Sequence, residues 1–439
     1  MAVDNANKRR QKLLLNFAIS SALLTMASTT FVQAEIMQNG MGGKLSSHFL
    51  SAENAALMNA IQPRISTTAA SAANGGADST EVYVLNHLKA QAIATSNTAL
   101  FALITAADTD DKAAQLAGEF TPDRSGANIY NVMLAQELFT QSIRKRTSDF
   151  LLGDSARSSM WASYLGSNNT SYITNDGMNR YDGFDASSSG FVVGYDQVLS
   201  QNSIMGVAFS HQKIDSEGRM YDNELQIESY QASLYGTQTW QDYYLSGRGV
   251  IGWNANTGAR SIGGELATGQ KTAAHSRYNS YNFAAEIDLV RPFYWGDFSI
   301  LPLLSAGYTH IRAEDYKENG SGSAAALAYE QQNYQELTFG LGLELAHSLY
   351  TNVGAFQTRA GIRSDIEVLD MDLTTTATLL SGGESFTVGI NESEDIRYES
   401  YVDLTWETNG SMTWSLGVQR NWDSSTETNV FYGRAVYSF

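Results

Sequence analysis

Apolar and polar side chains alternate along most of the chain after residue 158. Between residues 337 and 345, for example, Leu and Phe at odd positions alternate with Thr, Gly and Glu at even positions. A period of two residues is typical of a β-strand with one apolar face. The pattern predicts about twelve strands, over residues 158–166, 188–199, 203–214, 225–238, 243–256, 275–290, 297–311, 330–346, 354–370, 395–407, 412–422 and 429–439.

The last predicted strand ends on an aromatic residue. One face of residues 429–439 carries Phe431, Gly433, Ala435, Tyr437 and Phe439. A chain terminus frays unless it is paired. We therefore predict that this strand closes a sheet and that its partner is the first strand, residues 158–166.

The predicted connections alternate between short turns and long polar loops. Residues 200–202 and 239–242 are short turns, whereas 167–187 and 371–394 are long loops. Turns at one end and loops at the other are typical of outer-membrane barrels. We therefore predict an all-β transmembrane barrel of about 12 antiparallel strands whose apolar faces, including that of the last strand, point outward, with Arg434 in the lumen. A soluble β-sandwich, in which the same alternation points inward, is the alternative.

Residues before 156 show helical spacing instead of alternation. Apolar residues recur at intervals of three and four within 46–61, 83–107 and 128–152, and Asp110 and Asp111 can cap a short helix ending at Gly118. Residues 66–80 are rich in Ala, Ser, Thr and Gly, which predicts a linker. The barrel is thus expected to follow a mostly helical N-terminal region.

The N-terminus predicts export from the cytoplasm. Lys8, Arg9, Arg10 and Lys12 precede a mostly apolar stretch, residues 13–27, and Val32-Gln33-Ala34 fits a cleavage site before Glu35. This is the pattern of a secretory signal peptide, residues 1–34. A membrane anchor is the alternative, but about 20 apolar residues are needed to span a bilayer.

Composition excludes several functions. The 439 residues carry a formal net charge of −18 and no Cys. Disulfides and cysteine chemistry are therefore excluded, and an acidic chain offers no basic surface for nucleic acid.

Several motifs together resemble the autotransporters of Gram-negative bacteria (type V secretion). Met160-Trp161-Ala162-Ser163-Tyr164, with Gly166, resembles the first barrel strand of that family, and residues 190–196 (GFVVGYD) resemble the second. Residues 242–245 (DYYL) resemble the start of the fifth strand, and residues 143–146 (IRKR) the basic end of the helix before the barrel. The resemblance covers roughly residues 85–439, and it depends on the order of these motifs along the chain.

The resemblance implies a domain organisation. Residues 1–34 would be the signal peptide, 35–127 a short, mostly helical passenger or lead-in region, 128–155 a linker helix that threads and plugs the pore, and 156–439 the β-barrel domain. The barrel would lie among outer-membrane lipids and bring the N-terminal segment to the cell surface.

The resemblance also implies partners during biogenesis. Periplasmic chaperones and the barrel-assembly machinery would act on the chain, and the machinery would read the aromatic residues Phe431, Tyr437 and Phe439 of the last strand. Ala435 is smaller than the apolar residue that is common at its position in the family.

Charge supports a plugged pore. Residues 156–439 contain 16 Lys and Arg against 33 Asp and Glu. Four acids alternate with the outward apolar residues of their strands and are therefore predicted to face the lumen: Glu286, Asp288, Glu344 and Asp403. The cationic helix end, Arg144, Lys145 and Arg146, would be attracted to them. The alternative is that most acids lie on external loops and that the three cations face solvent.

The sequence offers no catalytic constellation. Gly153-Asp154-Ser155 lacks the rest of an esterase motif and a partner base, and the six His are scattered without metal-ligand spacing. A rim protease using His310, Glu314 and Asp315 would need a second acidic pair. We expect no enzyme activity and no cofactor. Because residues 139–155 contain no Asn, we also expect no self-cleavage between two Asn of the helix.

The role of residues 35–127 stays open between three alternatives. The segment could be a small surface adhesin, with a host or cell-surface ligand as its partner. It could be only the lead-in of a truncated autotransporter, which the absence of a 20–30-residue repeat favours. Or the whole chain could act as a porin-like channel.

Overall fold

The computed structural model describes residues 68–95, 97–152, 157–175, 179–263, 272–320, 323–369, 373–390 and 396–439. The chain divides into two compact units, one ending at Ala117 and the other spanning Gly118–Phe439. The predicted signal peptide and the predicted helix at 46–61 lie outside the described residues. No helix in the described part of the chain is both long enough and apolar enough to cross a membrane.

The first unit is helical where the structure describes it. Residues 68–74 are helical, and they are followed by α3 (Ser79–Thr95), α4 (Thr98–Ala106) and α5 (Asp110–Phe120). A reciprocal pair of bonds, Asp78 N–H to Glu81 and Glu81 N–H to Asp78, caps the start of α3 at 2.9 and 2.8 Å.

Two sequence predictions are wrong in this unit. Residues 66–80 were expected to be a linker, but their Ala-rich part forms helix, since Ala has the highest helix propensity. Residues 83–107 form two helices instead of one, because the Asn97 side chain accepts the Leu100 N–H at 3.0 Å and begins a new helix.

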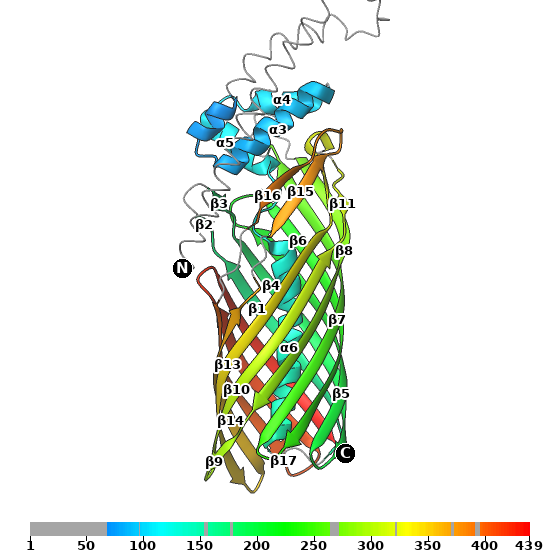
Figure 1. Ribbon diagram of the computed structural model, residues 1–439, viewed down its shortest axis with the longest axis vertical. Coiled ribbons are helices and arrows are strands. Elements are labelled where there is room, and N and C mark those ends of the chain that lie inside the picture. Colours follow the sequence, from blue (N-terminus) through cyan, green and yellow to red (C-terminus); the bar gives the residue numbers. More distant parts are fainter. Residues whose placement is uncertain are drawn as a thin grey trace, which may run out of the picture. The chain divides into compact units, whose positions relative to one another are not determined.

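The second unit is a closed antiparallel barrel of twelve strands, which confirms the predicted fold (Figure 1). The strands are β1 (Ser159–Ser171), β4 (Phe184–Ser200), β5 (Ser203–Gly218), β6 (Asn223–Trp240), β7 (Tyr243–Ile262), β8 (Thr272–Val290), β10 (Phe298–Ala313), β13 (Gln332–Thr351), β14 (Gly354–Glu367), β17 (Ile396–Thr408), β18 (Met412–Trp422) and β19 (Thr426–Ser438). Each pairs with the next along the chain, and β19 pairs with β1 to close the ring.

The last strand is paired over its whole length. β19 aligns with β1 from Ser438 opposite Ser159 to Thr426 opposite Ser171. The N–H of Phe439 donates to the Ser158 carbonyl at 3.0 Å, so pairing continues to the final residue. The predicted closing role of this strand is therefore confirmed.

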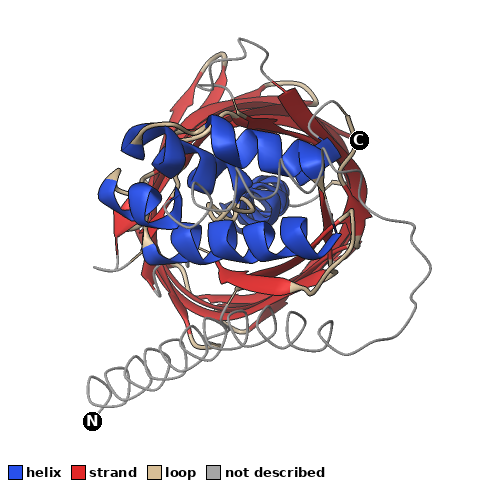
Figure 2. Cartoon of the chain, turned by 90° about the horizontal axis from the view of Figure 1, so that it is seen from above, coloured by secondary structure: helices blue, strands red, loops and turns tan. Residues whose placement is uncertain are grey.

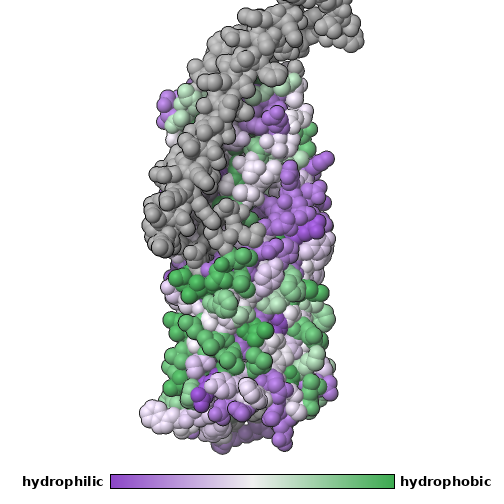
Figure 3. All heavy atoms as spheres, in the orientation of Figure 1, coloured by the Kyte–Doolittle hydropathy of each residue, from purple (hydrophilic) through white to green (hydrophobic). Residues whose placement is uncertain are grey.

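The sense of the alternation is that of a membrane barrel. Leu416 is 69 % exposed and Phe431 52 % exposed, whereas the inward Arg434 is 4 % exposed. On the face shown in Figure 3, hydrophobic residues gather on the half of the strands nearest the short turns. The alternative of a soluble sandwich is wrong for this chain.

The long connections contain structure that the sequence did not predict. β11 (Tyr316–Lys317), β12 (Leu327–Tyr329), β15 (Thr374–Leu379) and β16 (Phe386–Gly389) form a separate four-stranded sheet, which we name the outer lid. Elsewhere β2 (Thr174–Asn175) pairs with β3 (Arg180–Tyr181), β9 (Phe293–Trp295) pairs with β10, and η1 (Ser323–Ala325) is a single 3₁₀ turn.

A 26-residue helix, α6 (Ala127–Leu152), runs along the inside of the barrel (Figures 1 and 2). Its bounds lie close to those predicted, residues 128–152. The helix lies inside the ring of strands in the view from above (Figure 2). Most of its side chains are buried.

Candidate functional site

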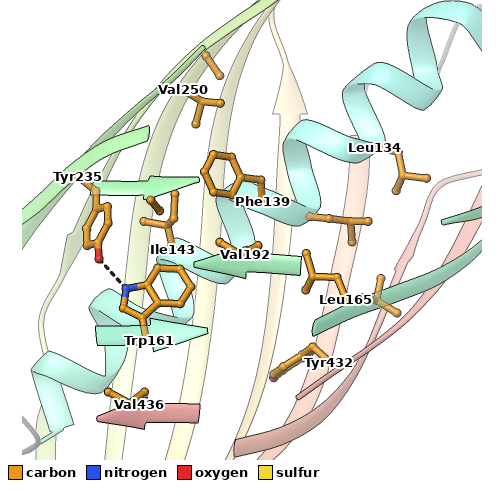
Figure 4. Packing of buried hydrophobic residues seen from close by; sticks show 14 residues of the cluster. Leu134, Phe139, Ile143, Trp161, Leu165, Val192, Tyr235, Val250, Tyr432 and Val436 are labelled. Atoms are coloured by element: carbon orange, nitrogen blue, oxygen red, sulfur yellow. Dashed lines mark hydrogen bonds between the residues drawn. The ribbon is translucent and has the colours of Figure 1, made fainter. Parts of the chain in front are cut away.

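One face of α6 packs against the barrel wall through apolar side chains. Leu134, Leu138, Phe139 and Ile143 of α6 share a buried cluster with wall residues of several strands (Figure 4). The wall residues are Trp161, Leu165, Val192, Ala208, Tyr235, Val250, Ala284, Val430, Tyr432 and Val436. This buried surface stabilises the helix in the lumen, at roughly 25 cal/mol per Å² of apolar area.

The Trp161 ring links this cluster to a polar relay. Its indole N–H donates to the Tyr235 hydroxyl at 2.8 Å (Figure 4). That hydroxyl donates to the Asp196 carboxylate at 3.1 Å. The ring lies against Gly194 of the neighbouring strand, where an added Cβ would come within 2.3 Å of it.

Arg144 of α6 meets two of the predicted lumen acids. Its guanidinium lies 2.6 Å from Glu286 and 3.9 Å from Asp288, and it also reaches Glu399 at 3.3 Å. Arg144, Glu286 and Glu399 are mostly buried, so their charges interact through a medium of low dielectric.

Lys145 lies over two aromatic rings and beside one acid. Its ammonium lies 3.6 Å from the centroid of the Tyr401 ring and 4.6 Å from that of Tyr432. The carboxylate of Asp403 is 4.0 Å away. A buried cation over two aromatic rings is stabilised by their π electrons.

Arg146 makes the most buried ion pair of the three helix cations. Its Nε and Nη2 donate to the two oxygens of Asp196 at 2.8 and 2.9 Å, and Nη2 also donates to Ser159. Both side chains of the pair are at most 1 % exposed. A two-point guanidinium–carboxylate contact fixes orientation as well as charge.

Glu344, the fourth predicted acid, meets no helix cation. It accepts a hydrogen bond from Ser148 of α6 at 3.2 Å and another from the Tyr401 hydroxyl. The structure thus places all four predicted acids at the lumen, three of them beside Arg144 or Lys145.

Sequence reasoning placed Arg434 in the lumen but missed Arg248, Arg359 and Arg363 of the wall and one acid of the helix. Arg248 and Arg363 share Glu286 with Arg144, at 2.7 and 3.0 Å. Asp149 of α6 lies 2.6 Å from Arg434 and 3.0 Å from Arg359. The lumen is therefore a mixed ionic network and not simply an acidic surface. The alternation of inward and outward side chains along each strand would have placed Arg248, Arg359 and Arg363 inward, as it placed Arg434 and the acids.

Small cavities remain beside α6, and two of them share several lining residues. One of about 140 Å³ is bordered by Glu137, Arg144 and Glu336, and one of about 70 Å³ by Lys145, Ser148 and Leu303. Arg144, Glu399 and Arg363 border both cavities. The helix and its ion pairs thus occupy the lumen between them.

The three aromatic residues predicted to form the assembly signal point away from the lumen. Phe431, Tyr437 and Phe439 are half-exposed on the outer surface, and Phe439 stacks on Tyr195 of β4 with ring centroids 6.3 Å apart. Ala435 leaves a shallow apolar hollow beside Tyr437 and Met160. These side chains are available to lipid or to a protein that meets this strand.

At the loop end, two carboxyl groups are buried near the start of α6. Burial, and secondarily the nearby charge of Asp123, raises the pKa of Asp182 to about 7. Burial also raises the pKa of Asp123, which accepts hydrogen bonds from Ser125. No cluster of three or more His, Asp or Glu within the described ranges could hold a metal ion.

The chain resembles known proteins in the barrel region. The model of the family "Autotransporter beta-domain" matches residues 160–419. An extracellular serine protease of Serratia marcescens is 24% identical over 233 residues, which cover 52% of this chain and 21% of that protein. The chain thus spans about a fifth of the length of the curated relatives it matches.

One solved structure supports the fold of the barrel. The translocator domain of the autotransporter NalP from Neisseria meningitidis superimposes with a TM-score of 0.54 at 14% identity, covering 70% of this chain and 98% of that one. The β-domain of the Bordetella autotransporter Brka covers 65% of this chain and 100% of its own, with a TM-score of 0.45 and 13% identity.

Proposed function

Because the chain belongs to the autotransporter β-domain family, we propose that its barrel carries the residues before α6 to the cell surface and retains α6 as a plug. The barrel itself is a translocator of the outer membrane, as the family match and the fold establish. The observation that carries the plug is the ionic network around Arg144 and Arg146, since it pairs helix charges with wall charges at the lumen.

The proposal divides the chain into four parts. Residues 1–34 are the signal peptide, 35–127 the exported region, 128–155 the pore segment and 156–439 the barrel. The end of the structured pore helix at Leu152 and the start of β1 at Ser159 support the last boundary. The helix begins at the end of the barrel that has the long loops, which face outward in outer-membrane barrels, so residues before 127 would emerge outside.

The exported region is proposed to have no catalytic activity. The match to the Serratia proteases covers only the barrel part of this chain, and the autotransporter β-domain is a transport barrel. Arg144, Lys145 and Arg146 are proposed to position the plug, together with Glu286, Asp288 and Asp403 of the wall. Phe431, Tyr437 and Phe439 are proposed to direct assembly, with periplasmic chaperones and the barrel-assembly machinery as partners.

Protease treatment of intact cells tests the proposal. An epitope tag inserted after Glu35 should be lost when intact cells are treated with proteinase K, while a tag in the periplasmic turn at residues 408–411 should persist. If the first tag persists in intact cells and is lost only after lysis, the N-terminal region is periplasmic and the proposed export is wrong.

A further inference from the structure

Residues 118–126, which we name the exit segment, join the first unit to α6 at the loop end of the barrel. Glu119 of this segment is bonded to the end of β7: its carbonyl accepts a hydrogen bond from Arg260, and its carboxylate accepts the N–H of Gly263. Arg124 lies 4.6 Å above the Tyr181 ring and donates to the Gly389 carbonyl of the outer lid at 3.3 Å. The exit segment therefore contacts both the barrel rim and the lid.

Arg260 connects three parts of the molecule at once. Besides the Glu119 carbonyl, it donates to both oxygens of Glu318 at 3.0 and 2.7 Å, and to the Ala325 carbonyl at 3.1 Å. Its side chain is 6 % exposed. One guanidinium on a barrel strand thus bonds the exit segment on one side and the connection that builds the lid on the other.

Glu318 anchors the lid through several donors. It accepts the Leu327 N–H at 2.9 Å and the Tyr329 hydroxyl at 3.1 Å in addition to Arg260. Its neighbour Asn319 exchanges two backbone hydrogen bonds with His275 of β8, at 2.7 and 2.8 Å. A carboxylate buried this deeply is stable only with its partners in place.

The lid also covers the first turns of α6. Leu373 and Ile390, which flank the lid strands β15 and β16, lie in one buried apolar cluster with Ala127, Ile129 and Tyr130. The inner residues of the lid, Ala377, Leu379, Phe386 and Val388, are buried as well. The residues that flank the lid strands thus pack against the start of the pore helix.

We propose that the outer lid and Arg260 form an exit clasp that closes on residues 118–126 once the chain has stopped moving, and that grips the chain where it leaves the barrel. The clasp depends on contacts of two specific residues, Glu119 and Arg124. Other parts of the chain that pass through the barrel mouth during export would not make these contacts. An open lid would separate Arg260 from Glu318 and from the Ala325 carbonyl, so these contacts form only when the lid is closed. The clasp rests on the proposed export, because it assumes that the loop end faces outward.

Trypsin treatment of intact cells that express the full chain tests the clasp. Trypsin cuts after Lys and Arg, and Lys112 and Arg124 are the consecutive sites on either side of Gly118. The membrane fragment is recovered and its first residue is determined by mass spectrometry. The clasp variants are Arg260→Met and Glu318→Gln. Arg420→Met is the control, since Arg420 forms an exposed ion pair with Glu427 at 2.8 Å.

In the wild type and the control, we expect cleavage after Lys112, which lies before Gly118, but no cleavage after Arg124. Both clasp variants should be cut after Arg124 roughly 100-fold faster, because loss of one partner of a buried ion pair favours local opening. If the Arg260→Met variant does not insert into the outer membrane, the milder Glu318→Gln variant alone tests the clasp.

Two results would overturn the clasp, and they are distinguishable. Equal cutting after Arg124 in wild type and variants, with cleavage before Gly118 in all, rejects the clasp and leaves export intact. Cleavage before Gly118 in lysed cells but not in intact cells rejects the proposed export and the clasp with it.

Discussion

Arg146 of the pore helix and Asp196 of β4 form a two-point ion pair that is almost inaccessible to solvent. The two N–O distances are 2.8 and 2.9 Å, and the side chains are 1 % and 0 % exposed. The same carboxylate accepts the Tyr235 hydroxyl, which in turn accepts the Trp161 indole N–H. The ion pair therefore links α6 to β4. Through Tyr235 and Trp161 the same network reaches β6 and β1.

Arg146→Met should strongly destabilise the barrel. The substitution leaves Asp196 buried and without its counter-charge, which typically costs about 3–5 kcal/mol. The measurement is the urea midpoint of the barrel purified in detergent. Arg420→Met removes an exposed ion pair and should cost about 0–1 kcal/mol. Similar midpoints for the two variants would show that the Arg146 pair contributes little.

Gly194→Ala should impair the barrel because the Trp161 ring occupies the space of a Cβ. The nearest ring atom would lie 2.3 Å from it, so the ring must move and lose its bond to Tyr235. Overpacking of this kind costs roughly 1–3 kcal/mol. Gly247→Ala is the control, since nothing lies within 4 Å of its Cβ position. The fraction of heat-modifiable, folded barrel should fall for the first variant and not for the second.

Phe439→Ser should reduce assembly in cells more than it reduces stability. Phe439 is 55 % exposed and adds no core packing, but its backbone N–H pairs with Ser158. We expect a several-fold loss of barrel in the outer membrane, with near-normal refolding of purified protein in detergent. Val418→Ser, at another outward site with 60 % exposure, is the control. Equal losses for both variants in cells would argue against a special role for the last residue.

Asp182→Asn should change how stability depends on pH. The folded pKa of Asp182, about 7, lies above its ordinary value of 3.8, so the folded protein binds this proton more tightly than the unfolded chain. The stability that this group contributes is therefore present at low pH and falls as pH rises from about 4 to about 7. The variant cannot ionise here and should be more stable than the wild type at about pH 8, but not at about pH 4. Urea midpoints at the two pH values measure this, and an unchanged difference would contradict it.

The barrel could be predicted because alternation within the strands and the lengths of the connections point to the same fold. Alternation at Leu337–Leu345 and at Phe431–Phe439 separated an apolar face from a polar face, and the alternating short turns and long loops favoured the outward sense of the apolar face. The same parity placed Arg434 and Asp403 inward, where they are found. The strands extend beyond the predicted ends on the loop side, as β1 does from 166 to Ser171, because polar residues there still pair with neighbouring strands.

The ionic network and the lid depend on contacts that sequence spacing does not encode. Asp149 lies three residues after Arg146 on α6 and could be taken for a local partner, yet its shortest contact is Arg434, far away in sequence. Glu318 and Arg260 meet only because a long loop folds back over the mouth. Lid strands such as β11, with two residues, are too short to show any period.

The conductance of the barrel in planar bilayers tests the central claim, that α6 plugs the translocator. Two variants are compared, one that lacks residues 35–117 and keeps α6, and one that lacks residues 35–152. We expect the first to stay almost closed, because α6 and its ion pairs occupy the lumen. The second should open a large and stable pore. Equal conductance of the two barrels would contradict the account.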